Sequence, residues 1–185
     1  DVKEHMAVED YCKDYMSFLN DARTEREAVR LGIKEAEKRG FAEYRRGMSL
    51  KPGSKVYFNN RGKALILAVM GTIPLSDGCV IAGAHVDAPR LDLKQIPLYE
   101  SDELAYLRTH YYGGIKKYQW VTVPLELHGV AVLKDGKTVD IVIGREKDDP
   151  KFIITDLLPH LAQDQMKKTM AEGITGEGLN ILIGS

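Results

Sequence analysis

The sequence predicts an α/β protein, and three observations support this fold class. Two helical stretches come first, with apolar residues at three- and four-residue spacing. A short apolar run, Val80 to Ala82, is then typical of a strand that is buried on both faces. After residue 90 the sequence becomes rich in strand-forming residues and turn signals, which indicates a second, β-rich part. Helices followed by such strands favour the start of an α/β sandwich.

Residues 4–20 are expected to form the first helix, because their apolar residues fall on one helical face. These residues are Val8, Tyr11, Tyr15, Phe18 and Leu19. A second helix is expected to begin after Thr24, since Thr24 and Glu27 have the spacing of a capping box. Its buried stripe would be Val29, Ile33 and Ala36, and Gly40 is placed to end it. Both helices are interpreted as scaffold.

A change of periodicity at Lys55 predicts strands. Residues 56–58 and 64–70 flank an Asn-Asn-Arg-Gly turn and are expected to form a hairpin whose second strand is deeply buried. Loops at residues 71–72 and 76–78 would then lead into the central strand, Val80 to Ala82.

The second half is predicted to be mainly β. Residues 91–98 favour a strand, residues 103–107 a short turn or helix, and residues 121–132 a further strand. The Lys-Asp-Gly-Lys sequence at 134–137 predicts a hairpin turn, followed by a return strand with alternating apolar residues at 139–143.

The end of the sequence combines one more helix with one more strand. Residues 157–170, after Asp156, are expected to be helical. Residues 179–183 are expected to form a strand that runs to the last residues of the sequence.

The composition excludes some functional classes. With 26 basic and 27 acidic residues the formal net charge is -1, so there is no electrostatic case for nucleic acid or an anionic membrane as a partner. Cys12 and Cys79 do not form a disulfide-dense pattern. The sequence also shows no signal peptide or apolar run of spanning length. We therefore expect a soluble protein in the reducing cytoplasm.

The central motif is the stretch from Cys79 to Arg90, in which an apolar run leads to His85, Asp87 and Pro89. Residues i and i+2 of a strand point to the same side, so the His85 imidazole can bind a metal while Asp87 orients it. On spacing alone, a histidine that ends a strand is more often a satisfied polar group. The motif by itself leaves both interpretations open.

Two blocks of sequence together resemble the aspartyl aminopeptidase family of dinuclear zinc metallopeptidases. The first is His85-Val86-Asp87-Ala88-Pro89 with its continuation to Gln95, and the second runs from Thr109 through Gly113-Gly114 to Trp120. The resemblance implies the N-terminal part of a zinc-peptidase-like α/β sandwich interrupted by a β-rich dimerisation domain. The catalytic domain would comprise residues 1–90 and the inserted domain residues 91–173. Residues 174–185 would return to the catalytic domain.

The resemblance also implies site residues and cofactors. His85 would be a ligand of one metal ion, and Asp87 the carboxylate that fixes its imidazole. A complete site would hold two zinc ions, with cobalt or manganese as alternatives, on five or six ligands. The family's other ligands come later than Ser185, so the 185 residues resemble the N-terminal portion of the enzyme. We expect this polypeptide to be inactive alone.

Three further residues are candidates for substrate or interface roles. His110 belongs to the second block, where a structural role is an equal alternative, and His160 lies in the Pro-His-Leu-Ala sequence. Family members specific for acidic residues carry a histidine where this sequence has Asp164. A carboxylate there would repel an acidic substrate, which argues against specificity for Asp or Glu.

Three functional hypotheses remain. The first is a metal-dependent aminopeptidase that removes N-terminal residues from peptides and forms a homo-oligomer through the inserted domain, with dimers building a larger assembly. The second is a non-catalytic oligomerisation or binding module, which the missing ligands favour for the isolated 185 residues. The third, a generic α/β domain with an incidental His-x-Asp, is disfavoured by the two matching blocks.

Overall fold

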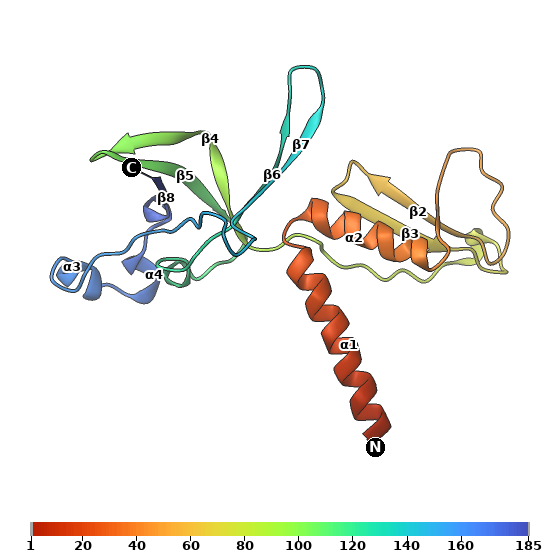
Figure 1. Ribbon diagram of the computed structural model, residues 1–185. Coiled ribbons are helices and arrows are strands. Elements are labelled where there is room, and N and C mark those ends of the chain that lie inside the picture. Colours follow the sequence, from red (N-terminus) through yellow and green to blue (C-terminus); the bar gives the residue numbers. More distant parts are fainter. Residues whose placement is uncertain (1, 185) are drawn as a thin grey trace. The chain divides into compact units, whose positions relative to one another are not determined.

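The computed structural model describes residues 2–184 of the chain and has a mixed α/β fold (Figure 1). The chain divides into two units, residues 1–88 and residues 89–185. The first holds two helices and a small sheet, whereas the second is built mainly from hairpins. Among the residues described, none of the helices combines the length and apolarity that crossing a membrane requires.

The first helix, α1 (Val2–Asp21), confirms the predicted element and extends it at both ends. None of its residues is buried, and its apolar face is open to solvent within the described chain. Tyr11 and Tyr15, one turn apart, stack with their ring centroids 6.3 Å from each other. The helix therefore carries an apolar stripe that does not contribute to the core of its unit.

The second helix, α2 (Glu25–Lys38), begins with the predicted capping box. The Thr24 hydroxyl accepts a hydrogen bond from the Glu27 amide at 3.3 Å, and the Glu27 carboxylate accepts one from the Thr24 amide at 2.9 Å. Val29 and Ala36 are buried as expected. Gly40 follows the helix with φ of 81°, a left-handed conformation that glycine adopts without steric cost.

A three-stranded sheet packs against α2, with the strand order β1-β2-β3. Its members are β1 (Ala42–Glu43), β2 (Lys55–Asn60) and β3 (Ala64–Val69), and β2 and β3 form the predicted antiparallel hairpin. The Tyr57 ring is buried beneath α2, and its hydroxyl donates a hydrogen bond to the Glu37 carboxylate at 2.9 Å. That hydrogen bond raises the pKa of Tyr57.

Two expectations about burial in this unit are wrong. Strand β3 is not deeply buried, because Ile66, Leu67 and Val69 expose 61%, 50% and 59% of their surface. Residues 80–82 form no strand in the structure, and Val80 and Ile81 are almost fully exposed. A strand buried on both faces needs hydrogen-bonded neighbours and covering layers. Within residues 2–184 the sheet ends at β3 and does not extend to this segment.

The second unit begins with a long hairpin formed by β4 (Arg90–Ser101) and β5 (Leu104–Tyr112). Asp102 and Glu103 connect the strands, both with positive φ (53° and 62°), as a two-residue turn between twisted strands requires. The predicted strand at 91–98 is confirmed. The turn or helix expected at 103–107 is wrong, because the tight turn places Leu104 directly opposite Ser101.

Strand β8 (Ile181–Gly184) confirms the predicted last strand and pairs antiparallel with β5. Its neighbour Leu179 and Ile181 form the buried core of this unit with Val121 and Ile154. The buried Thr109 hydroxyl donates a hydrogen bond to the Leu179 carbonyl, which fixes the approach to β8. In this structure the segment completes the sheet of the second unit. Its return to the first domain stays a prediction about a longer chain.

A second hairpin, β6 (Leu127–Val132) and β7 (Thr138–Ile143), confirms the turn predicted at 134–137. The strand expected from residue 121 begins only at Leu127. Thr122 has φ of 60° and Pro124 lacks an amide hydrogen, so neither suits the middle of a strand. Leu125 still pairs with Phe152 through an isolated bridge, which ties the hairpin to the core.

The helix predicted at 157–170 is largely wrong. Only two short helices form here, α3 (Gln163–Met166) and α4 (Met170–Gly173), and η3 (Gly176–Gly178) is a single 3-10 turn. Pro159 disfavours helical geometry at the residue before it. The Asp156 carboxylate accepts hydrogen bonds from the Leu157 amide and from the Gln165 side chain, at 2.8 and 2.9 Å. The segment is thus folded back as a loop around α3.

Candidate metal-binding site

The site is centred on His85 and Asp87, which follow the extended, exposed segment of the first unit. His85 Nδ1 lies 3.2 Å from Asp87 Oδ1 and 3.0 Å from the Asp87 carbonyl oxygen. Both oxygens are acceptors, so Nδ1 carries the proton when the imidazole is neutral. The two residues singled out in the sequence are therefore close in space, and the Asp87 carboxylate contacts the His85 imidazole.

This contact has a consequence for the other ring nitrogen. When Nδ1 donates to a carboxylate or carbonyl, Nε2 is left with a lone pair, which is the arrangement that metal-binding histidines use. The His85 side chain is 81% exposed and the Asp87 side chain 36% exposed. The imidazole is therefore not a satisfied histidine enclosed in a core, and Nε2 is open to a ligand.

One imidazole does not make a metal centre. Within residues 2–184, no three His, Cys, Asp or Glu side chains gather in a group that could hold a metal ion. Zinc sites use three or four protein ligands, and His85 with an orienting Asp87 supplies one. The residues present fit one ligand position of a zinc site and not a complete site.

His110 lies on the exposed part of β5, in the second unit, and stacks on Tyr111 with ring centroids 5.6 Å apart. It also lies near Glu177, whose carboxylate accepts hydrogen bonds from Lys94 at 2.9 and 3.1 Å. The Lys94 hydrogen bond and charge, with a smaller contribution from His110, lower the pKa of Glu177. The ion pair of Lys94 and Glu177 thus connects β4 to η3, and His110 lies beside it.

His160 and Asp164 belong to the loop that replaces the expected helix. Both are exposed, and Asp164 forms an ion pair with Lys167 at 2.9 Å across one helical turn. The side chains of this ion pair are 93% and 75% exposed, so it is a weak surface contact. The roles predicted for His110, His160 and Asp164 stay predictions.

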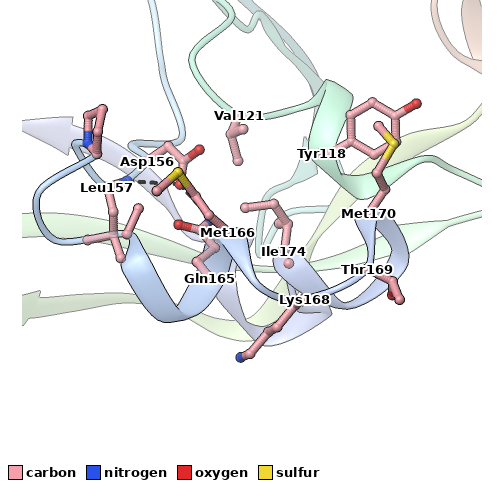
Figure 2. Close-up of a pocket in the computed structure, with 13 residues that line it drawn as sticks. Tyr118, Val121, Asp156, Leu157, Gln165, Met166, Lys168, Thr169, Met170 and Ile174 are labelled. Carbon is pink, nitrogen blue, oxygen red and sulfur yellow. Dashed lines mark hydrogen bonds between the residues drawn. The ribbon is translucent and has the colours of Figure 1, made fainter.

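A cavity in the second unit was not predicted from the sequence. Figure 2 shows this cavity, which has a volume of about 340 Å³ and lies between the turn before Val121 and the loop around α3 and α4. Met166, Met170 and Ile174 contribute apolar walls, and Tyr118 lies at the same wall as Met170. The sequence did not reveal this cavity, because residues 157–170 have the pattern of a single helix, whereas the structure has two short helices here.

Comparison with known protein families identifies the class to which this chain belongs. Residues 18–184 match the model of the aminopeptidase I zinc metalloprotease family, M18, and the chain belongs to this family. The resemblance to aspartyl aminopeptidases is thereby confirmed.

Individual relatives agree with this assignment. A probable M18 family aminopeptidase 1 from Clostridium acetobutylicum is 53% identical over 100% of this chain and 40% of its own length. The crystal structure of an M18 aminopeptidase from Thermotoga maritima has a TM-score of 0.88 and 40% identity, over 96% of this chain and 39% of its own. The chain thus spans about 40% of the length of the curated relatives it matches.

A more distant structure shares the fold alone. The mApe1 dodecamer of S. cerevisiae has a TM-score of 0.68 and 18% identity, over 86% of this chain and 41% of its own.

Proposed function

We propose that this chain is the part of a metal-dependent aminopeptidase that supplies the first metal ligand. In this proposal His85 binds one of two zinc ions through Nε2, with cobalt or manganese as alternative metals, and Asp87 is the positioning residue that holds the imidazole. The whole protein removes N-terminal residues from peptides in the cytoplasm. The chain of 185 residues is inactive by itself.

The observation that supports the proposal most is the geometry of His85 and Asp87 in a member of a zinc metalloprotease family. Nδ1 is engaged at 3.0 to 3.2 Å by two acceptors of Asp87, so Nε2 is presented as the ligating atom. Zinc in such a site polarises a carbonyl and activates water. The residues of this chain orient one ligand and leave the base and the remaining ligands to other segments.

Further parts of the proposal concern partners and specificity. Assembly as a homo-oligomer through residues 91–173 is supported by the fold shared with the S. cerevisiae mApe1 dodecamer. Specificity for acidic residues is argued against by Asp164, whose exposed carboxylate would repel an acidic side chain if that loop reached a substrate.

A hybrid enzyme tests the proposal. These 185 residues would replace the matching part of the Clostridium acetobutylicum relative, with which they share 53% identity. The hybrid should bind about two zinc ions per chain and cleave aminoacyl-anilide substrates. His85→Ala should lose at least one zinc ion and most of the activity. The control is His5→Ala in exposed α1, which should lose neither.

The result for Asp87 separates positioning from ligation. Asp87→Asn keeps an acceptor for Nδ1 but removes the charge, so we expect weaker zinc binding by about 10- to 100-fold rather than loss of the site. A hybrid that keeps two zinc ions and full activity after His85→Ala would refute the proposal.

The second candidate function is a non-catalytic oligomerisation or binding module. It is favoured by the absence, within residues 2–184, of a group of three metal-ligating side chains. This candidate predicts a hybrid that folds and assembles but neither binds zinc nor cleaves peptides.

A further inference from the structure

The loop of residues 144–151 connects the hairpin of β6 and β7 to the core of the second unit (Figure 1). At the base of this hairpin, Leu125 and Phe152 exchange two backbone hydrogen bonds, at 2.8 and 3.2 Å. Two residues further on, Ile154 is 1% exposed and belongs to the core. The conformation of the loop therefore decides how the hairpin leaves the core.

The half-buried Asp149 holds the first part of this loop. Its Oδ2 accepts hydrogen bonds from the amides of Gly144 and Glu146, at 3.0 and 3.1 Å. The Asp149 amide in turn donates a hydrogen bond to the Glu146 carbonyl at 3.2 Å. Hydrogen bonds to an ionised carboxylate are roughly twice as strong as those between neutral groups. The carboxylate therefore stabilises the turned conformation of residues 144–149.

Lys151 supplies the opposite charge to the same two residues. Its ammonium donates hydrogen bonds to the carbonyl oxygens of Gly144 and Glu146, the latter at 2.8 Å. Gly144 and Glu146 thus have their amides on the Asp149 carboxylate and their carbonyls on the Lys151 ammonium. Two oppositely charged side chains therefore hold one short piece of backbone from both of its polar sides.

Gly144 also packs this backbone against the other end of the hairpin. The residue is buried and has φ of 97°, a conformation that glycine adopts readily. A Cβ at this position would lie 3.2 Å from the Glu126 Cα and from the Leu125 carbonyl oxygen, and 3.3 Å from the Pro150 carbonyl oxygen. The loop is therefore in close contact with the residues that lead into β6.

We propose that residues 144–151 form a latch, in which Asp149 and Lys151 together fix the base of the β6–β7 hairpin on the core. The latch is a conformational device: it keeps residues 127–143 as a fixed arm of the second unit instead of a mobile flap. Segments of one protein differ in the free energy of local opening, and the latch raises this free energy for the hairpin. His85 takes no part in it, so its test is independent of zinc binding.

Hydrogen exchange followed by mass spectrometry tests the latch in the hybrid enzyme, where the hairpin has the surroundings of a longer chain. Lys151→Met removes the ammonium but keeps an unbranched side chain. Peptides that cover residues 125–130 and 140–146 should then exchange at least about 10-fold faster, because the base of the hairpin opens locally. Peptides around the buried Leu179 should change by less than about twofold, because the core stays closed.

A matched control separates the latch from a general effect of charge. Lys147 is an exposed lysine of the same loop, and Lys147→Met should leave the exchange of the hairpin unchanged. Equal acceleration by Lys147→Met and Lys151→Met would overturn the proposal. Unchanged exchange in Lys151→Met would also overturn it, as would an acceleration that is equally large around Leu179, since that would show a loss of stability throughout the unit.

A double-mutant cycle tests whether the two charged residues act as one device. Asp149→Ala removes the acceptor of two amides and should accelerate exchange in the same peptides as Lys151→Met. Because either change opens the same latch, the double variant should exchange little faster than the faster single variant. Accelerations that multiply in the double variant would show two independent contacts and would refute a single latch. Circular dichroism checks that each variant is folded.

Discussion

Leu179 is expected to be the most sensitive position of the second unit. Its side chain is fully buried, at 0% exposure, and it packs in the core with Ile154 and Ile181. Replacing a buried leucine by alanine removes the burial of three carbon atoms and leaves a cavity, which together cost about 2–5 kcal/mol. Because the hydrogen bond from Thr109 goes to the backbone carbonyl of Leu179, the substitution leaves that bond in place.

The measurement is urea unfolding followed by the fluorescence of Trp120, the single tryptophan of the chain, which packs against this core. With an m-value of about 1–2 kcal/mol/M, a loss of about 3 kcal/mol lowers the midpoint by about 1.5–3 M urea. Leu161→Ala is the control, because Leu161 is 72% exposed and should change the free energy of unfolding by less than about 0.5 kcal/mol. A loss below about 1 kcal/mol for Leu179→Ala would refute the assignment of this core.

Three further predictions concern local features. Thr24→Ala removes the hydroxyl acceptor of the capping box and should lower the stability of the first unit by about 1 kcal/mol in thermal unfolding followed by circular dichroism. Gly144→Ala should destabilise more than Gly136→Ala in urea unfolding. Both glycines have positive φ, but only the former would bring a Cβ within 3.2–3.3 Å of backbone atoms. Lys94→Gln should raise the pKa of Glu177, as followed by NMR titration of its carboxyl carbon, and an unchanged pKa would exclude the hydrogen bond.

The sign of the pH effect follows from the direction of that shift. Because Lys94 lowers the pKa of Glu177 in the folded chain, their interaction stabilises the fold at neutral pH. The stabilisation is lost as the pH falls through the lowered pKa. In the Lys94→Gln variant, the free energy of unfolding should therefore fall less than in the wild type as the pH is lowered through the acidic range.

Local signals in the sequence predicted elements well. The capping box at Thr24, the hairpin turn at 59–62 and the turn at 134–137 depend on neighbouring residues, and the structure has a capping box and a hairpin connection at these places. Burial and long-range pairing were predicted less well. The exposure of β3 and of residues 80–82 depends on which strands lie beside them, and this information is not local.

The loop at 157–170 and the candidate metal site also show that contacts between distant residues are harder to predict from the sequence than local structure. Helical periodicity there was overridden by Pro159 and by the hydrogen bond between Asp156 and Gln165, a contact that spacing does not reveal. The proximity of His85 and Asp87 could be predicted, because residues two apart in an extended segment share a side. The ligands that would complete a zinc site could not be found in residues 2–184 by either route.

The zinc content of the purified protein of 185 residues, measured with its aminopeptidase activity, tests the central claim most directly. We predict no stoichiometric pair of zinc ions and no cleavage, because His85 supplies one ligand of a site that needs several. Two zinc ions bound per chain of 20.7 kDa, with cleavage of peptides, would contradict the account.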